Sequence, residues 1–133
     1  MSRWCVCRGV EGLRRSRRTV VISRLDRRVF RKRVDFITSP GLRPEDGSRL
    51  KLGIPGAGPT KVITDKAVLE ADPVTGELIL GGLYPGVDPA EVAAGVCWPL
   101  RSGTQLDYIP PPGNEELHLL REVLDPKRLY LKG

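Results

Sequence analysis

Two stretches near the middle of the sequence carry residue types that commonly line a ligand site. Ser39-Pro40-Gly41 follows an apolar segment, and Gly53-Ile54-Pro55-Gly56-Ala57-Gly58-Pro59 lies in a long loop that spans residues 42–60. A serine hydroxyl can donate a hydrogen bond, and glycine lets the backbone approach a ligand closely. The same residue types also end strands and form plain connections, so both interpretations stay open. The loop lacks the Gly-Lys-Ser/Thr ending of a phosphate-binding P-loop.

The histidine and cysteine content argues against a metal centre. His118 is the sole histidine, and Cys5, Cys7 and Cys97 are the three cysteines. Paired zinc ligands usually have about two to four residues between them, whereas one residue separates Cys5 from Cys7. An odd cysteine count also argues against a disulfide scaffold. We therefore expect no metal site, a surface or partly buried His118, and a buried Cys97 that packs as a small hydrophobic residue.

The net charge of +6 is concentrated at one end of the chain. Residues 1–33 contain 12 lysines and arginines but only two acidic residues. Residues 1–18 show no apolar periodicity, so we expect a disordered basic leader ahead of one domain that spans residues 19–133. A nucleic-acid-binding arm is an alternative, because basic clusters bind phosphates. Phe30 is the only aromatic residue between positions 14 and 33, and no nucleic-acid motif follows, which disfavours that function.

The pattern of apolar residues predicts short strands and few helices. The expected strands are 19–23, 34–38, 61–64, 67–72 and 77–83, with a Pro-to-Gly hairpin turn before the last of them. Helices are expected at 89–94, after the N-cap Asp88, and at 115–124, after Asn114. Asp26 could cap a further short helix at 27–33, and residues 96–113 read as irregular. No apolar run is long enough to span a bilayer and no secretory signal is recognisable, so a cytoplasmic location is expected.

Four segments in order resemble one protein family. They are residues 34–41 (VDFITSPG), residues 56–68 (GAGP followed by VITD and AV), residues 85–92 and residues 110–126. Together they resemble the B (beta) subunits of class I coenzyme A-transferases of the glutaconate type. The resemblance covers residues 19–129 and corresponds to the carboxyl-terminal half of such a subunit.

The resemblance implies a fold, a partner and a reaction. The fold is α/β, an open sheet with flanking helices that forms part of the coenzyme A-transferase (ribose-5-phosphate isomerase-like) architecture. The partner is the A (alpha) subunit of the same enzyme, and coenzyme A (CoA) is a substrate, with no separate cofactor. In this family a glutamate carboxylate attacks an acyl-CoA thioester, and an enzyme-bound glutamyl-CoA thioester follows. The residues expected to line the acyl-CoA cleft are Ser39, Gly41, Gly56, Gly58 and Pro59.

The sequence also departs from the family pattern. The family's catalytic glutamate lies well upstream of the VDFITSPG segment, and here only 33 residues precede that segment. Glu11 is the only glutamate among them, and its arginine-rich surroundings do not resemble those of the nucleophile. No catalytic residue is therefore assigned, and the chain is expected to be truncated and inactive alone. The alternatives are a CoA-ester hydrolase subunit of the same family and a non-catalytic structural remnant. Self-association into a homo-oligomer is also possible.

Overall fold

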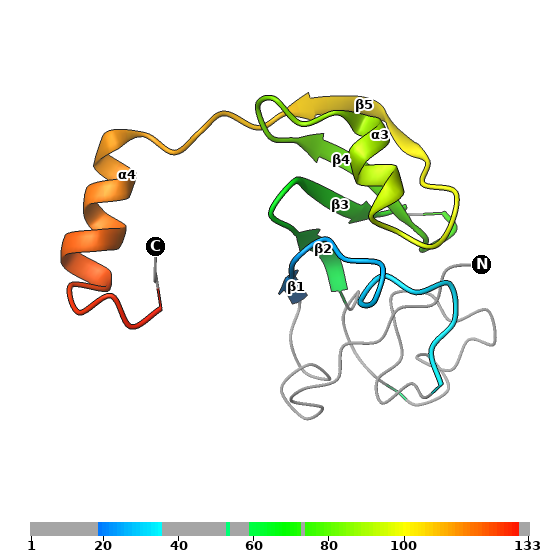
Figure 1. Cartoon of the computed structure of the whole chain (residues 1–133), viewed down its shortest axis with the longest axis horizontal. Coiled ribbons are helices and arrows are strands. Elements are labelled where there is room, and N and C mark those ends of the chain that lie inside the picture. Colours follow the sequence, from blue (N-terminus) through cyan, green and yellow to red (C-terminus); the bar gives the residue numbers. More distant parts are fainter. Residues whose placement is uncertain (1–18, 36–52, 54–58, 73, 131–133) are drawn as a thin grey trace.

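A computed structural model describes residues 19–35, 53, 59–72 and 74–130 of the chain. Its centre is a single five-stranded sheet in the order β1-β2-β3-β4-β5 (Figure 1). The strands are β1 (Thr19–Ile22), β2 (Pro59–Ile63), β3 (Ala67–Ala71), β4 (Leu78–Leu83) and β5 (Ser102–Tyr108). The sheet is open and mixed, which confirms the expected fold class.

Four of the five strands run in the same direction. β1 pairs with β2 in parallel, β3 is antiparallel to both of its neighbours, and β4 pairs with β5 in parallel. The carboxyl ends of β1, β2, β4 and β5 therefore lie along one edge of the sheet, called here the carboxyl edge. Open α/β sheets commonly bind ligands at such an edge.

Short polar side chains close the two hairpin turns. Between β2 and β3, the buried hydroxyl of Thr64 donates to Ala67 O and accepts from the backbone N–H of Ala67, with oxygen–oxygen and nitrogen–oxygen distances of 2.7 and 2.9 Å. Between β3 and β4, Asp72 Oδ1 accepts from the N–H groups of Val74 and Thr75, both at 2.8 Å. Gly76 has a φ of 71°, which a side chain would disfavour. The predicted hairpin is confirmed.

Helix α3 (Pro89–Ala94) connects β4 to β5, and its predicted bounds are confirmed. Asp88 is the N-cap and accepts from the N–H of Ala90, as the sequence predicted. Gly95 ends the helix with a φ of −78°, so it is not needed there for a left-handed conformation. A glycine fits here because there is little room for a side chain: a Cβ at position 95 would lie 2.6 Å from Leu25 Cγ.

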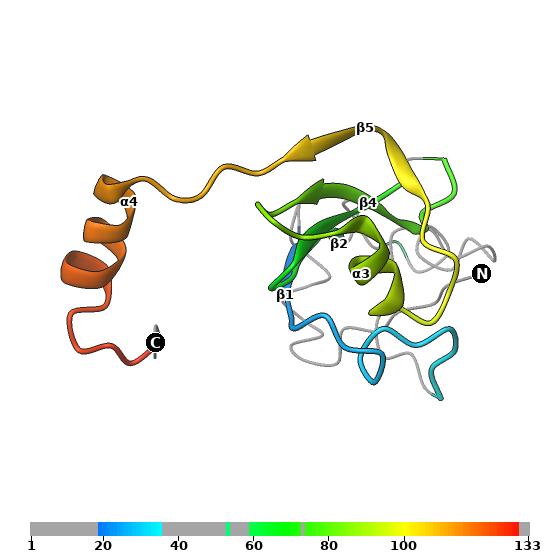
Figure 2. The same cartoon turned by 45° about the horizontal axis from the view of Figure 1, so that its top comes forward.

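The core lies between one face of the sheet and α3, which covers that face in Figure 2. Val92 and Val96 pack there against strand residues and against Phe30, which comes from the segment after β1. The buried core consists of Phe30, Val62, Ala67, Leu69, Leu78, Leu80, Leu83, Val92 and Val96.

The other face of the sheet is more open. Val20 is 51% exposed and Ile22 is 81% exposed, and their register partners on β2 are Lys61 and Ile63. Sheets with parallel strands are normally covered on both faces. Within the described part of the chain, no helix packs over this second face (Figure 2).

The chain continues beyond β5 as a separate element, called here the C-terminal arm (residues 109–130). It contains the helix α4 (Asn114–His118) and the π-helix η1 (Leu119–Leu124). This agrees closely with the helix predicted at 115–124. Its N-cap is Gly113 rather than Asn114, and the N–H of Gly113 donates to Glu116 Oε2 at 2.8 Å. Figures 1 and 2 show the arm standing apart from the sheet.

Three local predictions were wrong or only partly tested. Residues 96–113 are not irregular throughout, because β5 occupies positions 102–108. The short helix expected at 27–33 is a turn, in which Phe30 N donates to Asp26 O at 2.9 Å. The strand expected at 34–38 is not present at positions 34 and 35, and its remaining residues lie outside the described ones.

Candidate functional site

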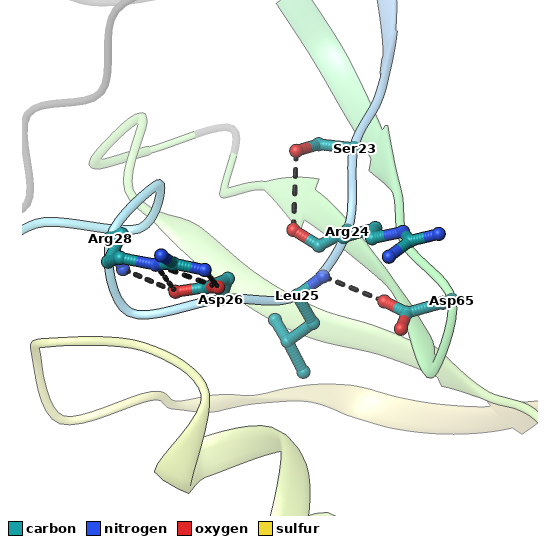
Figure 3. A network of polar contacts seen from close by, with 6 residues as sticks. All are labelled: Ser23, Arg24, Leu25, Asp26, Arg28 and Asp65. Carbon is teal, nitrogen blue, oxygen red and sulfur yellow. Dashed lines mark hydrogen bonds and ion pairs between the residues drawn. The ribbon is translucent and has the colours of Figure 1, made fainter.

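A polar network occupies the carboxyl edge where β1 and β2 end (Figure 3). The segment after β1 lies against the turn after β2, because the N–H of Leu25 donates to Asp65 Oδ1 at 2.7 Å. Ser23 N also donates to Ile63 O at 3.0 Å. Asp65 thus holds one loop of this edge to another.

Asp26 and Arg28 form the exposed end of the same network. Asp26 Oδ1 accepts from the backbone N–H of Arg28 at 2.7 Å, and Asp26 Oδ2 accepts from Arg28 Nη2 at 2.9 Å. The side-chain hydrogen bond from Arg28 lowers the pKa of Asp26, and the same contact raises the pKa of Arg28. Because this pair is exposed to solvent, it orders the loop more than it stabilises the fold.

The basic segment after β1 is tied to the folded domain. Phe30 is buried in the core, and its carbonyl accepts from the N–H of Cys97 at 3.0 Å. Cys97 itself is half-buried, and its Sγ lies 3.5 Å from the carbonyl oxygen of Arg27. These contacts hold to the folded domain a segment with exposed cationic side chains, namely Arg24, Arg27, Arg28, Arg31, Lys32 and Arg33.

A second set of contacts braces the turn after β2 against α3. Lys66 Nζ forms an ion pair with Glu91 on α3. The carbonyl of Lys66 accepts from the N–H of Tyr84, just after β4, at 3.3 Å. These two contacts hold the carboxyl ends of β2 and β4 close to the first turn of α3, and so order this part of the carboxyl edge.

The predicted cleft residues are not brought together in the described structure. Pro59 begins β2, is buried, and pairs with Thr19 at the amino end of the strands, across the sheet from the carboxyl-edge network. Ser39, Gly41, Gly56 and Gly58 lie outside the described residues. The acyl-CoA cleft expected from them therefore stays a prediction.

Each glutamate of the described sheet, of the turn before β4 and of α3 forms an ion pair. Glu70 pairs with Lys61 across β2 and β3 at 2.6 Å, Glu77 pairs with Arg101 at 2.9 Å, and Glu91 pairs with Lys66. Arg101 also approaches Asp72 at 3.6 Å. Within the described sheet, the β3–β4 turn and α3, each glutamate therefore has a cationic partner.

The structure describes no metal centre and no membrane helix. Among the residues it describes, no three histidine, cysteine, aspartate or glutamate side chains cluster closely enough to hold a metal ion. His118 lies exposed on α4. In the same described part of the chain, no helix is long and apolar enough to cross a membrane.

Sequence comparison finds two curated relatives. The chain is 30% identical over 125 residues to the B subunit of glutaconate CoA-transferase from Acidaminococcus fermentans, a match that covers 93% of this chain and 47% of that protein. It is 32% identical over 108 residues to the B subunit of 3-oxoadipate CoA-transferase from Pseudomonas knackmussii, covering 81% of this chain and 42% of that protein. The chain thus spans about half the length of the relatives it matches. No family model matches it.

Structural comparison finds the same relationship. The crystal structure of glutaconate coenzyme A-transferase from Acidaminococcus fermentans matches with a TM-score of 0.78 at 30% identity, covering 94% of this chain and 48% of that one. The crystal structure of IpdAB from Rhodococcus jostii RHA1 matches with a TM-score of 0.69 at 25% identity, covering 92% of this chain and 49% of that one.

Proposed function

Because this chain is a relative of the glutaconate-type B subunits of class I coenzyme A-transferases and fits their carboxyl-terminal half, we propose that it works in an A/B complex that moves CoA between an acyl-CoA and a carboxylic acid. The observation that carries the proposal is the structural match to glutaconate coenzyme A-transferase. It extends over 94% of the chain with a TM-score of 0.78.

In the proposed reaction, this chain forms part of the acyl-CoA site but does not supply the reacting carboxylate. A glutamate from outside this chain attacks the thioester carbonyl and expels the CoA thiolate, which leaves an acyl-glutamyl anhydride. The thiolate then attacks the glutamyl carbonyl, so that glutamyl-CoA forms and the donor's carboxylate departs. The acceptor carboxylate passes through the same two steps in reverse, which releases the new acyl-CoA and restores the glutamate. The ion pairs of Glu70, Glu77 and Glu91 support this division of roles, since each of those carboxylates already has a cationic partner.

The proposal includes the residues that the sequence predicted to line the acyl-CoA cleft. Ser39, Gly41, Gly56 and Gly58 line the acyl-CoA cleft together with Pro59, whose backbone begins β2. The complex acts in the cytoplasm.

A CoA-transfer assay tests the proposal. The natural protein that contains this sequence is purified alone, and the A-type subunit from the same organism is purified separately. Transfer of CoA from an acyl-CoA to a carboxylic acid is then followed for each protein and for the mixture. We expect turnover in the mixture, none with either protein alone, and none with a separately purified chain of residues 1–133. Absence of transfer from the mixture over a broad panel of carboxylic acids would contradict the proposal. Acyl-CoA hydrolysis without an acceptor would identify a hydrolase instead.

A further inference from the structure

The stretch of chain that follows β1 concentrates positive charge. This basic segment (residues 24–33) contains six cationic residues and one acidic residue, a net charge of +5. Arg28 forms an ion pair with Asp26. Among the residues that the structure describes, the other five cations have no ion-pair partner. They are all exposed, namely Arg24, Arg27, Arg31, Lys32 and Arg33.

The cations of the sheet region are arranged differently. Lys61, Lys66 and Arg101 each form an ion pair with a carboxylate. Like charges that are held close together repel one another, so a cluster that is not neutralised disfavours the compact state. An anion bound to such a cluster relieves that repulsion. The basic segment is therefore the part of the described chain best suited to bind an anionic ligand.

The backbone of the basic segment is held in place. Leu25 N donates to Asp65 Oδ1 at 2.7 Å, which fixes the start of the segment at the carboxyl edge (Figure 3). Phe30 is buried in the core, and its carbonyl accepts from Cys97 N at 3.0 Å. Between these anchors the carbonyl of Asp26 accepts from Phe30 N at 2.9 Å and closes a turn. A loop that is ordered in advance loses less conformational entropy on binding.

Two arginines lie beside this anchored turn. The carbonyl oxygen of Arg27 is 3.5 Å from Cys97 Sγ, and Arg31 N donates to Val29 O at 3.1 Å. Both side chains are exposed, and neither has an ion-pair partner among the described residues. Their backbone positions are thus fixed while their guanidinium groups stay accessible to a ligand.

The chemistry of the segment is that of a phosphate site. A guanidinium group binds phosphate oxygens through two parallel hydrogen bonds, and five of the six cations are arginines. CoA carries a pyrophosphate and a ribose phosphate at the end remote from its thiol. We propose that the basic segment binds the phosphate groups of CoA, with Arg27 and Arg31 as principal contacts. This inference rests on the proposed function, because it takes CoA as the ligand of this chain.

The position of the segment in the chain also favours CoA. The segment begins at the carboxyl edge, where open α/β sheets commonly bind ligands. Its last residue, Arg33, is six positions before Ser39, the first residue predicted to line the acyl-CoA cleft. The pantetheine arm of CoA separates the phosphates from the thioester. A phosphate-binding segment just before the predicted cleft residues therefore matches the layout of the ligand.

Other anions fit the segment less well. Proteins that bind single-stranded nucleic acids commonly stack bases on exposed aromatic side chains. Phe30 is the only aromatic residue of the segment, and it is 4% exposed because it packs in the core. Carboxylates of another protein, or of another part of the natural protein, would compete for the same arginines, and the experiment separates that case from CoA.

Three matched variants of the natural protein, each in complex with the A-type subunit, test the inference. R27Q/R31Q removes two charges from the segment, R27K/R31K keeps them, and R121Q/K127Q removes two exposed charges from the C-terminal arm. Calorimetry measures the affinity for CoA at low and at high salt, and the affinity for a single-stranded oligonucleotide. Sedimentation reports whether the A-type subunit stays bound, and thermal unfolding reports the stability of the fold.

We expect R27Q/R31Q to weaken CoA binding at least about tenfold and to make the remaining binding less sensitive to salt, because charged contacts to phosphate are lost. R27K/R31K should fall between the parent and R27Q/R31Q, since lysine keeps the charge but not the paired hydrogen bonds. R121Q/K127Q should bind CoA within about twofold of the parent. Unchanged CoA affinity in R27Q/R31Q, or no CoA binding by the parent complex, would overturn the inference.

Three further results would also overturn it. An equal loss of CoA affinity in R121Q/K127Q would show an effect of total charge alone. Release of the A-type subunit or a lower unfolding temperature in R27Q/R31Q would show that the arginines pair with protein. Tighter binding of the parent to the oligonucleotide than to CoA would identify a nucleic-acid surface. CoA binding that depends on the segment without transfer to any carboxylic acid would contradict the proposed function and leave this inference standing.

Discussion

At the residue scale, the aspartates of this chain mainly organise the backbone. Each of five accepts at least one backbone N–H and so closes a turn, caps a helix or joins two loops. They are Asp26, Asp65, Asp72, Asp88 and Asp125. These hydrogen bonds give each of the five a structural role.

Acidification should weaken the β3–β4 hairpin through Asp72. Hydrogen bonds from the N–H groups of Thr75 and Val74 lower the pKa of Asp72 below that of the unfolded chain. The folded state then binds fewer protons than the unfolded state, so this stabilisation is present above about pH 4 and is lost as pH falls through the folded pKa. Urea unfolding between pH 7 and pH 2 should show D72N less sensitive to pH than the parent. An identical pH dependence for both proteins would contradict this role of Asp72.

Gly95→Ala should destabilise the domain, although alanine normally favours a helix end with ordinary backbone angles. The new Cβ would lie 2.6 Å from Leu25 Cγ, and such overpacking typically costs about 1 to 3 kcal/mol. Gly113→Ala is the matched control, because the nearest atom to its Cβ is Glu116 Oε2 at 3.8 Å. Urea unfolding should lower the stability of G95A clearly more than that of G113A. Equal stability would show that Leu25 moves aside at little cost.

The sequence predicted some of these residue roles and missed others. Asp88 before Pro89 is a local helix-start signal, and it predicted the cap correctly. The constraint on Gly95 comes from Leu25, which is 70 positions away in sequence, so no local pattern reveals it. Asp125 gave no local signal, because its partners at 129 and 130 follow from a folded-back tail. Contacts that depend on tertiary placement cannot be read from spacing.

At the element scale, the strands with apolar β-branched residues were predicted and the polar one was not. β5 has the sequence SGTQLDY, which neither alternates cleanly nor carries a run of apolar residues. It is a strand because the α3 crossover returns the chain beside β4, where Leu80 pairs with Ser102 and Leu83 with Tyr108. Such a strand is specified by its neighbour rather than by its own propensity.

The turn between β2 and β3 should depend on the hydroxyl of Thr64. This buried oxygen accepts from the N–H groups of Lys66 and Ala67 and donates to Ala67 O. Thr64→Val keeps the shape but leaves buried donors unpaired, which should cost about 1 to 3 kcal/mol. Thr64→Ser keeps the hydroxyl and should lose less. Thermal and urea unfolding would compare the two, and a valine variant as stable as the serine variant would count against the hydrogen bonds.

At the scale of the whole molecule, the described chain is a domain with two uncovered surfaces. One face of the sheet packs against α3 and forms the core. The second face leaves Ile22 exposed, and the C-terminal arm leaves Leu119, Leu120, Val123 and Leu124 exposed. The resemblance of residues 34–41 and three further segments predicted the family and the fold, and both are confirmed. The cleft residues stay a prediction, because four of the five lie outside the described residues.

The central claim is that this domain helps to form an acyl-CoA site whose reacting carboxylate comes from elsewhere. The direct test is to incubate the A/B mixture with an acyl-CoA, reduce any enzyme-bound thioester with borohydride, and locate the reduced glutamate by peptide mass spectrometry. The account predicts an acyl-CoA-dependent modification on a glutamate outside residues 1–133. A modification on any glutamate of this chain, including the ion-paired Glu70, Glu77 and Glu91, would contradict it.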